Sequence, residues 1–245
     1  MAVATVDLPA EVITIPDEFL GYPLESFSIP DHYRDDLEYV FLPAGMLRDR
    51  TQKLAADIFV SYPPGESITL VCVLKSGLGF FNALMAALQS LNSCPALART
   101  RSDHDDKFGG RHLSRPLLSE FVRVSSYIDD HSTGNVQISG IEKMAGSVTG
   151  KNVILLDDMI DTGATMKHTL EAFAKLSPKS LKATTLLRKR CPGATGYIPD
   201  FLGFDIPDRF VVGFSIDYNQ YFRDCEHLCV VNEVGKRKYA SGRVA

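Results

Sequence analysis

The residues best suited to chemistry lie in one short stretch of the chain, residues 155–165. An apolar run there ends in two adjacent carboxylates, Asp157 and Asp158, and an Asp-Thr-Gly turn at residues 161–163 then leads into a predicted helix. Backbone N–H groups and the dipole at the start of a helix favour an anion such as a phosphate monoester. Gly163 lets the backbone approach that ligand closely, and the carboxylates can accept hydrogen bonds from sugar hydroxyls. The stretch therefore predicts a binding site for a phosphate monoester and a sugar.

The turn by itself also fits a structural role, because Asp and Thr are both preferred at helix N-caps. Two acids at the end of an apolar strand, three residues before the cap, favour a functional site instead. Other phosphate-binding motifs are excluded. The Gly-Lys pair at residues 150–151 lacks the upstream Gly and the following Ser or Thr of a P-loop, and Gly77 and Gly79 lack the third glycine of a dinucleotide fingerprint.

Elements with the right periodicity flank this stretch on both sides. The expected strands are residues 68–74, 121–124, 153–156 and 181–187, and the expected helices are residues 44–62, 80–91 and 165–176. Strands that alternate with helices indicate an α/β fold with a parallel sheet, in which ligands bind beyond the carboxyl ends of the strands. Two further short strands, residues 201–204 and 210–216, are assigned to a smaller cap.

Length, composition and charge exclude several classes of protein. The chain has 245 residues, 45% hydrophobic and 23% charged, as expected of a globular protein that buries a core. Its 26 Lys and Arg against 30 Asp and Glu give a net charge of −4, without the basic surplus of a general nucleic-acid binder. No run approaches the ~18 apolar residues of a membrane span, and the N-terminus has no secretory pattern. We therefore expect a cytoplasmic protein with neither nucleic acid nor membrane as a partner.

The cysteines indicate a reducing compartment. They are five in number, an odd count without a Cys-x-x-Cys pair, which is typical of free thiols. Cys225, His227 and Cys229 alternate at a spacing that would place them on one face of a strand. Structural zinc normally takes four ligands and no fourth is nearby, so we interpret these three as core and surface residues of a late strand.

The chain resembles the type I phosphoribosyltransferases, and among them those that act on hypoxanthine and guanine. Residues 155–165 match the phosphoribosyl-diphosphate motif of that family, an apolar strand followed by two acids, two apolar residues and Asp-Thr-Gly. Four further blocks match in order and approximate spacing, and the resemblance extends from about residue 37 to about residue 239. These blocks are residues 73–77, 126–127, 187–190 and 210–224.

The resemblance implies an α/β fold of the type I phosphoribosyltransferase kind, with a central, mostly parallel sheet flanked by helices. Residues 1–245 would form a single domain with its core at about 40–190, and a small hood would come from the N- and C-terminal segments, about 1–39 and 191–245. A polar insertion at about 93–117 is expected to be mobile. A mobile active-site loop is expected at about 125–140.

The activity implied is that of a purine salvage enzyme. It would transfer the 5-phosphoribosyl group from 5-phosphoribosyl 1-diphosphate to N9 of hypoxanthine or guanine, giving IMP or GMP and diphosphate. Mg²⁺ would bridge diphosphate and ribose hydroxyls. Relatives form homodimers or homotetramers. Two alternatives stay open: a catalytically weak paralogue that acts as a nucleotide-binding regulator, and an enzyme of the same kind that also accepts xanthine.

Several roles at the purine and ribose follow from the resemblance. Asp161 takes the position beside purine N7, where a carboxylate acts as base or hydrogen-bond partner of the ring. The acids at residues 157–158 would contact ribose hydroxyls, and residues 161–165 would hold the 5′-phosphate. Lys189 would recognise the purine 6-oxo group, because an ammonium donor rejects a 6-amino group. Without the resemblance, the Arg-Lys-Arg run at residues 188–190 would indicate a solvated surface.

Other roles belong to the base and the diphosphate. Phe210 would stack on the purine, and the backbone of Val211 would contact its pyrimidine edge. Asp217 is expected to bind Mg²⁺ directly or through water, and Arg223 to contact diphosphate. Lys75 would begin the diphosphate loop after a non-proline cis peptide. The residues expected to bind substrate are Lys75, Ser76, Gly77, Ser126, Tyr127, Asp157, Asp158, Met159, Ile160, Asp161, Thr162, Gly163, Ala164, Thr165, Lys189, Phe210, Val211, Asp217 and Arg223, and those expected at Mg²⁺ are Asp157, Asp158 and Asp217.

The sequence departs from the family pattern at a few positions. Ser76 stands where relatives usually have a glycine, and Ser125 and Ala164 stand where they often have lysine. Two cations near the substrate polyanion are therefore missing, which bears on substrate affinity more than on the type of reaction. The insertion at residues 93–117 is also longer than the usual connection.

Overall fold

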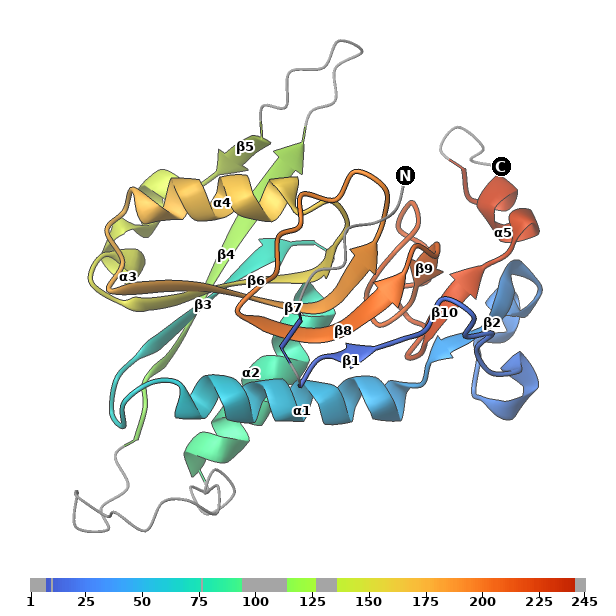
Figure 1. Cartoon of the computed structure of the whole chain (residues 1–245), viewed down its shortest axis with the longest axis horizontal. Helices are drawn as coiled ribbons and strands as arrows, with labels where there is room; N and C mark the ends of the chain where they lie inside the picture. Colours follow the sequence, from blue (N-terminus) through green and yellow to red (C-terminus); the bar gives the residue numbers. More distant parts are fainter. Residues whose placement is uncertain (1–7, 10, 76, 94–113, 127–135, 241–245) are drawn as a thin grey trace.

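The computed structural model describes residues 8–9, 11–75, 77–93, 114–126 and 136–240, and is built around one seven-stranded sheet (Figure 1). The strands run in the order β1-β8-β7-β6-β3-β4-β5, and all neighbours are parallel except β4 and β5. The predicted α/β fold with a mostly parallel sheet is confirmed. The strands are β1 Ile13–Thr14, β3 Ile68–Leu74, β4 Leu117–Ser126, β5 Val136–Ser139, β6 Asn152–Ile160, β7 Ser180–Arg190 and β8 Phe201–Pro207.

Helices cover both faces of this sheet. Helices α1 (Ala44–Val60) and α2 (Leu78–Ser93) lie on one face, and α3 (Ala145–Val148) and α4 (Ala164–Ala174) lie on the other (Figure 1). Strand β3 is therefore buried on both of its faces. Leu70 packs in the core under α1 and α2, and its neighbour Val71 packs in the core on the opposite side of the sheet. A continuous apolar run is what a strand buried on both faces requires.

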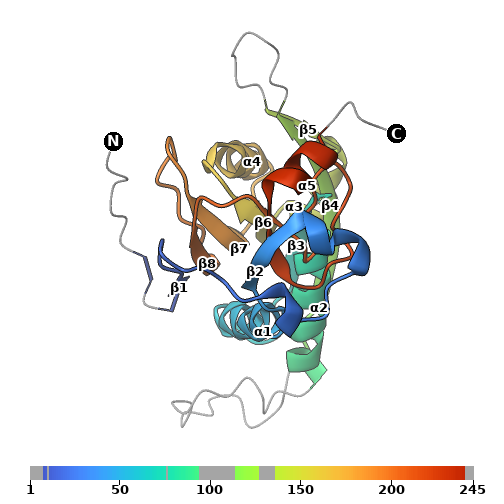
Figure 2. The same cartoon turned by 90° about the vertical axis from the view of Figure 1, so that its right-hand side faces the viewer.

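The hood is a separate three-stranded antiparallel sheet with short helical elements around it (Figure 2). It lies beyond the carboxyl ends of the parallel strands, where ligands bind in sheets of this kind (Figure 1). Its own core contains Tyr33, Phe222 and Val212. Its elements are η1 Leu24–Ser26, η2 Asp31–Asp36, β2 Leu37–Leu42, β9 Val211–Val212, β10 Leu228–Val231 and α5 Glu233–Lys238.

The assignment of residues 201–204 to the hood is wrong. They belong to β8, which pairs in parallel with β7 in the main sheet, and β1 from the N-terminal segment extends that sheet further. Sequence periodicity missed this because no helix separates β7 from β8. The chain between them, residues 191–200, is an irregular loop.

The expected strand over residues 210–216 is also wrong in its length. Only Val211–Val212 form a strand, β9, which pairs with β10. The chain then turns through three residues with positive φ, Gly213 (+98°), Phe214 (+52°) and Ser215 (+75°). An apolar run cannot continue as a strand through left-handed backbone.

Most of the two segments expected to be mobile, about 93–117 and about 125–140, lies outside the described part of the chain, which omits residues 94–113 and 127–135. The end of the insertion is anchored, because the buried Arg115 and Asn92 exchange two hydrogen bonds of 2.9 and 3.0 Å. The two ends of the expected loop at 125–140 are strands that pair with each other, because β4 and β5 form an antiparallel pair.

No helix in the described ranges has both the length and the apolar character required to cross a membrane.

A buried ion-pair network joins β7, β8 and the N-terminal segment. Asp205, 2% exposed, accepts from Arg188 at 2.5 Å and from Arg190 at 2.8 Å, one guanidinium on each carboxylate oxygen. Arg190 also donates to the carbonyl of Ile15 at 2.6 Å and to exposed Asp17. Because Arg188 and Arg190 flank residue 189 on alternate positions of a strand, both point to one face and the residue between them points to the other.

Removing the central carboxylate should destabilise the protein strongly. Asp205→Asn leaves the buried Arg188 guanidinium without its counter-charge and Arg190 with only the exposed Asp17, and a broken buried pair costs about 3 kcal/mol or more. Urea unfolding measures the loss. Asp17→Asn, which removes only an exposed partner of Arg190, serves as the control and should change stability far less. Equal, small losses in both variants would contradict a structural role for this network.

Candidate active site

The two adjacent acids lie inside β6 and not after it. Strand β6 runs on to Ile160, so Asp157, Asp158, Met159 and Ile160 are strand residues, where the sequence predicted a strand that ends at 156. Successive strand side chains point to opposite faces, and Asp158 is only 4% exposed while Asp157 is half-buried. The Asp157 carboxylate accepts a 3.0 Å hydrogen bond from the N–H of Asp158.

Burial is the main influence on the titration of this pair. Burial first, and then the neighbouring charge of Asp158, raise the pKa of Asp157 well above the ordinary value for an aspartate. Burial and the same two acids raise the pKa of the Cys72 thiol on the adjacent strand β3 to about 12. The end of β6 is therefore an environment that disfavours negative charge.

The turn after β6 has the backbone that the sequence predicts. Gly163 has φ +85° and serves as the N-cap of α4, which begins at Ala164. A Cβ on Gly163 would lie 2.8 Å from Thr195 Oγ1, so a larger residue would clash as well as being strained. The first-turn N–H groups of a helix have no intrahelical acceptor, and α4 therefore directs donors to the space beside Asp161 and Thr162.

Lys189 and Asp161 form an ion pair at the end of the sheet. Lys189 Nζ lies 3.1 Å from Asp161 Oδ1, with the lysine side chain only 11% exposed and the aspartate 58% exposed. The basic run that contains Lys189 is thus not a solvated surface. Its two arginines turn to Asp205 and the lysine turns to the acid after β6.

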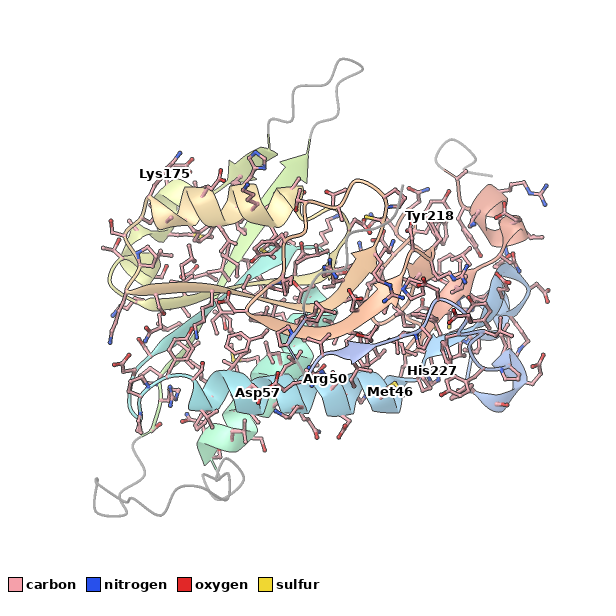
Figure 3. The ribbon with its side chains drawn as sticks, in the orientation of Figure 1. Met46, Arg50, Asp57, Lys175, Tyr218 and His227 are labelled. Carbon is pink, nitrogen blue, oxygen red and sulfur yellow. The ribbon has the colours of Figure 1, made fainter. Side chains whose placement is uncertain are left out.

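The hood contributes a second ion pair and an aromatic ring. Arg223 Nη2 lies 2.7 Å from Asp217 Oδ1, and its Nη1 donates to the carbonyl of Ser215 at 2.6 Å. Phe210 is 40% exposed and meets the edge of Tyr218, labelled on the hood in Figure 3, with 5.0 Å between ring centroids. Val211, the next residue, is buried in β9.

The expected diphosphate loop is described in part. The peptide bond between Leu74 and Lys75 is cis, as expected, and Gly77 follows with space for no side chain, since a Cβ would lie 2.8 Å from the Val73 carbonyl. Ser76 lies outside the described residues. The start of α2 then meets the hood, because a Cβ on Gly79 would clash with Ser215.

Some predicted site residues are not tested or not brought together. Tyr127 lies outside the described residues, and Ser126 is described only as the last residue of β4. Asp157, Asp158 and Asp217 do not converge, and no group of three or more potential metal ligands occurs among the residues that the structure describes.

The side chains of the Cys-x-His-x-Cys stretch contact other parts of the protein. His227 lies against the first turn of α1 (Figure 3), where its Nδ1 accepts from the N–H of Ala44 at 3.0 Å. Cys225 and Cys229 are buried with their sulfur atoms 3.9 Å apart. Only Cys229 lies on a strand, β10, so the expectation that all three alternate along one strand is wrong.

Comparisons with known proteins agree with this geometry. Residues 44–219 match the model of the phosphoribosyl transferase domain. The chain belongs to the phosphoribosyltransferase family. Hypoxanthine-guanine phosphoribosyltransferases of Bos taurus and Homo sapiens are 44% and 43% identical to it over 227 residues, which cover 93% of this chain and 96% of each relative. A crystal structure of the Schistosoma mansoni enzyme in complex with IMP superposes with a TM-score of 0.72 at 34% identity, covering 94% of this chain and 100% of that one.

The sequence did not reveal two residues that contact the candidate site of this phosphoribosyltransferase, Asp205 and Thr195. Asp205 and its two arginines fix the strand on either side of Lys189, and Thr195 touches the turn at Gly163. Neither Asp205 nor Thr195 lies in a recognisable sequence motif. The alternation of Arg188, Lys189 and Arg190 could have indicated that the two arginines share a buried partner, but only if β7 was known to extend to Arg190.

The raised pKa of Asp157 makes the stability of the protein depend on pH. Because the pKa of Asp157 is higher in the folded than in the unfolded protein, this residue contributes its full share of stability below the ordinary aspartate pKa. That contribution to the free energy of unfolding is lost as pH rises through the raised pKa. Asp157→Asn, which stays neutral, should therefore be more stable than the wild type at about pH 8, with the advantage shrinking towards about pH 4. Urea unfolding across this range measures it. The exposed Asp49→Asn on α1 is the control, and a Asp157→Asn difference that does not change with pH would contradict the prediction.

Proposed function

We propose that this phosphoribosyltransferase transfers the 5-phosphoribosyl group from 5-phosphoribosyl 1-diphosphate to N9 of hypoxanthine or guanine, yielding IMP or GMP and diphosphate. The observation that carries this proposal is the Lys189–Asp161 pair, 3.1 Å apart, beside the turn that begins α4. A cationic donor next to a carboxylate matches a purine that presents a 6-oxo acceptor and a neighbouring ring N–H. The names of the mammalian relatives and the IMP complex of the Schistosoma enzyme support the same substrates.

The chemistry required is a displacement at C1 of the ribose. The bond from C1 to the diphosphate oxygen breaks, N9 of the purine forms the new bond to C1, and the purine loses a proton. Asp161 is suited to accept or share that proton at the imidazole edge of the ring, as a positioned carboxylate does in general base catalysis. Its pairing with Lys189 holds both side chains near the proposed position of the base.

Lys189 selects the base through its hydrogen-bond chemistry. An ammonium group only donates, so it pairs with the lone pairs of a 6-oxo group and leaves a 6-amino group unsatisfied. Phe210 offers an exposed aromatic face for stacking, and Val211 offers backbone at its side. We propose that the preference for 6-oxopurines comes from Lys189, and that hypoxanthine, guanine and xanthine differ only at a position contacted by backbone.

The polyanionic part of the substrate meets backbone donors and an arginine. Residues 161–165 are proposed to hold the 5′-phosphate at the start of α4, with Thr162 and Thr165 adding hydroxyl donors. Arg223, already oriented by Asp217 and the Ser215 carbonyl, is proposed to contact the leaving diphosphate. Lys75, Ser76 and Gly77, with Ser126 and Tyr127, complete the proposed diphosphate and lid contacts.

The residues present fit a magnesium ion held partly by substrate. Mg²⁺ prefers oxygen ligands and usually takes one or two carboxylates together with phosphates and waters, so a cluster of three protein ligands is not required. Asp217, or Asp157 with Asp158, would supply the carboxylates. When bound, the ion would neutralise charge that develops on the departing diphosphate.

A catalytically weak, nucleotide-binding regulator is the alternative, and retention of Asp161 argues against it. We further propose a cytoplasmic location, supported by the odd number of cysteines without a Cys-x-x-Cys pair. The resemblance alone supports a homodimer or homotetramer.

Steady-state rates with four bases test the proposed reaction. With Mg²⁺ and 5-phosphoribosyl 1-diphosphate, we expect turnover of hypoxanthine and guanine and little turnover of adenine, while xanthine reports on the wider specificity. Asp161→Asn should lower kcat by about 10²–10⁴-fold, the usual contribution of a general base. The exposed Asp49→Asn on α1 is the control. Turnover of Asp161→Asn like that of the wild type would remove its role, and tight nucleotide binding without turnover of any purine would favour the regulator.

A further inference from the structure

The loop between β7 and β8 makes hydrogen bonds to the turn that begins α4 through Thr195. Its backbone N–H and its hydroxyl both donate to the same acceptor, the carbonyl oxygen of Thr162, each at 2.8 Å. The hydroxyl also occupies the space where a side chain on Gly163 would be. Two donors from one residue therefore hold one carbonyl of the turn.

Fixing this carbonyl fixes an N–H group on the opposite side of the same peptide. The peptide group between Thr162 and Gly163 is planar and trans, so the carbonyl of Thr162 and the N–H of Gly163 point in opposite directions. With the carbonyl held towards Thr195, the N–H of Gly163 is directed away from it. Glycine tolerates many backbone conformations, so this peptide has little intrinsic resistance to rotation.

A rotated peptide would harm an anion site. It would replace a donor with a carbonyl oxygen, and an oxygen lone pair repels a phosphate that an N–H would bind. The two hydrogen bonds from Thr195 to the Thr162 carbonyl resist this rotation.

We propose that Thr195 is a positioning residue for the phosphate-binding turn, and that its hydroxyl raises affinity for the 5′-monophosphate group of the nucleotide. The inference rests on the proposed function, because it takes residues 161–165 to be the phosphate site. Thr195 does not touch the ligand itself; it acts through the Thr162–Gly163 peptide.

A purely structural role predicts a different outcome. Thr195 is exposed, and the packing of its loop comes from Tyr197, which lies against the core under α4. Thr195→Val removes the hydroxyl and keeps both the shape of the side chain and the backbone N–H that donates to Thr162. The substitution therefore deletes the hydroxyl bond to Thr162 and a longer bond, 3.4 Å, that the hydroxyl accepts from the N–H of Tyr197. It leaves the backbone bond to Thr162 and the packing of the Tyr197 side chain in place.

Paired binding measurements with GMP and guanosine test the proposal. The two ligands share base and ribose and differ only in the phosphate, so their affinity ratio isolates the phosphate site. By calorimetry on the full chain, Thr195→Val should bind GMP about 5-fold more weakly than the wild type, the effect of one hydrogen bond, with guanosine affinity unchanged. Thr195→Ser should restore GMP binding. Thr149→Val, which removes an equivalent exposed hydroxyl bond to the Leu176 carbonyl at 2.9 Å, should leave both affinities unchanged.

Three results would overturn the inference. Unchanged GMP affinity in Thr195→Val would show that the hydroxyl does not orient the turn, and equal losses for GMP and guanosine would show a general structural role. A wild type that binds GMP no more tightly than guanosine would contradict the phosphate site itself, and the role of Thr195 with it. The first two results would leave the proposed function intact. The ratio of GMP to guanosine affinity in the wild type distinguishes them from the third result, which would contradict the phosphate site.

Discussion

The proposed function depends on one interaction, between the phosphate group of the substrate and the backbone N–H donors at the start of α4. The constraint is severe, because those donors follow directly after a strand that carries Asp157 and Asp158. A helix N-terminus attracts an anion, whereas two carboxylates nearby repel it. Burial and then the neighbouring charge of Asp158 raise the pKa of Asp157, so the fold places this acid where negative charge is disfavoured. Gly163, with φ +85°, turns the chain from the end of β6 into α4.

Ion pairs within the protein orient two cations of the candidate site. Lys189 is held by Asp161, and Arg223 is held by Asp217. A side chain that is already held in one orientation loses less entropy when it binds a polyanion. The Arg188–Asp205–Arg190 network serves the same end from the other face of the sheet, because it sets the direction in which residue 189 points.

The sequence predicted those parts of the site that depend on local patterning. The continuous apolar run of β3, the start of α4 and the glycine turn all follow from spacing and residue type. The end of β7 did not, because Arg-Lys-Arg has no strand pattern of its own and is held extended by Asp205 on the neighbouring β8. Strand β8 was missed because a loop precedes it in place of a helix. Thr195 carried no signal at all, since its contact with Thr162 joins residues 33 positions apart.

A crystal structure of the full chain with GMP bound tests the central claim most directly. We expect the 5′-phosphate within hydrogen-bond distance of the backbone N–H groups of residues 161–165, with the guanine 6-oxo group at Lys189. A nucleotide whose phosphate lies elsewhere, with the turn before α4 making no contact to it, would contradict the account.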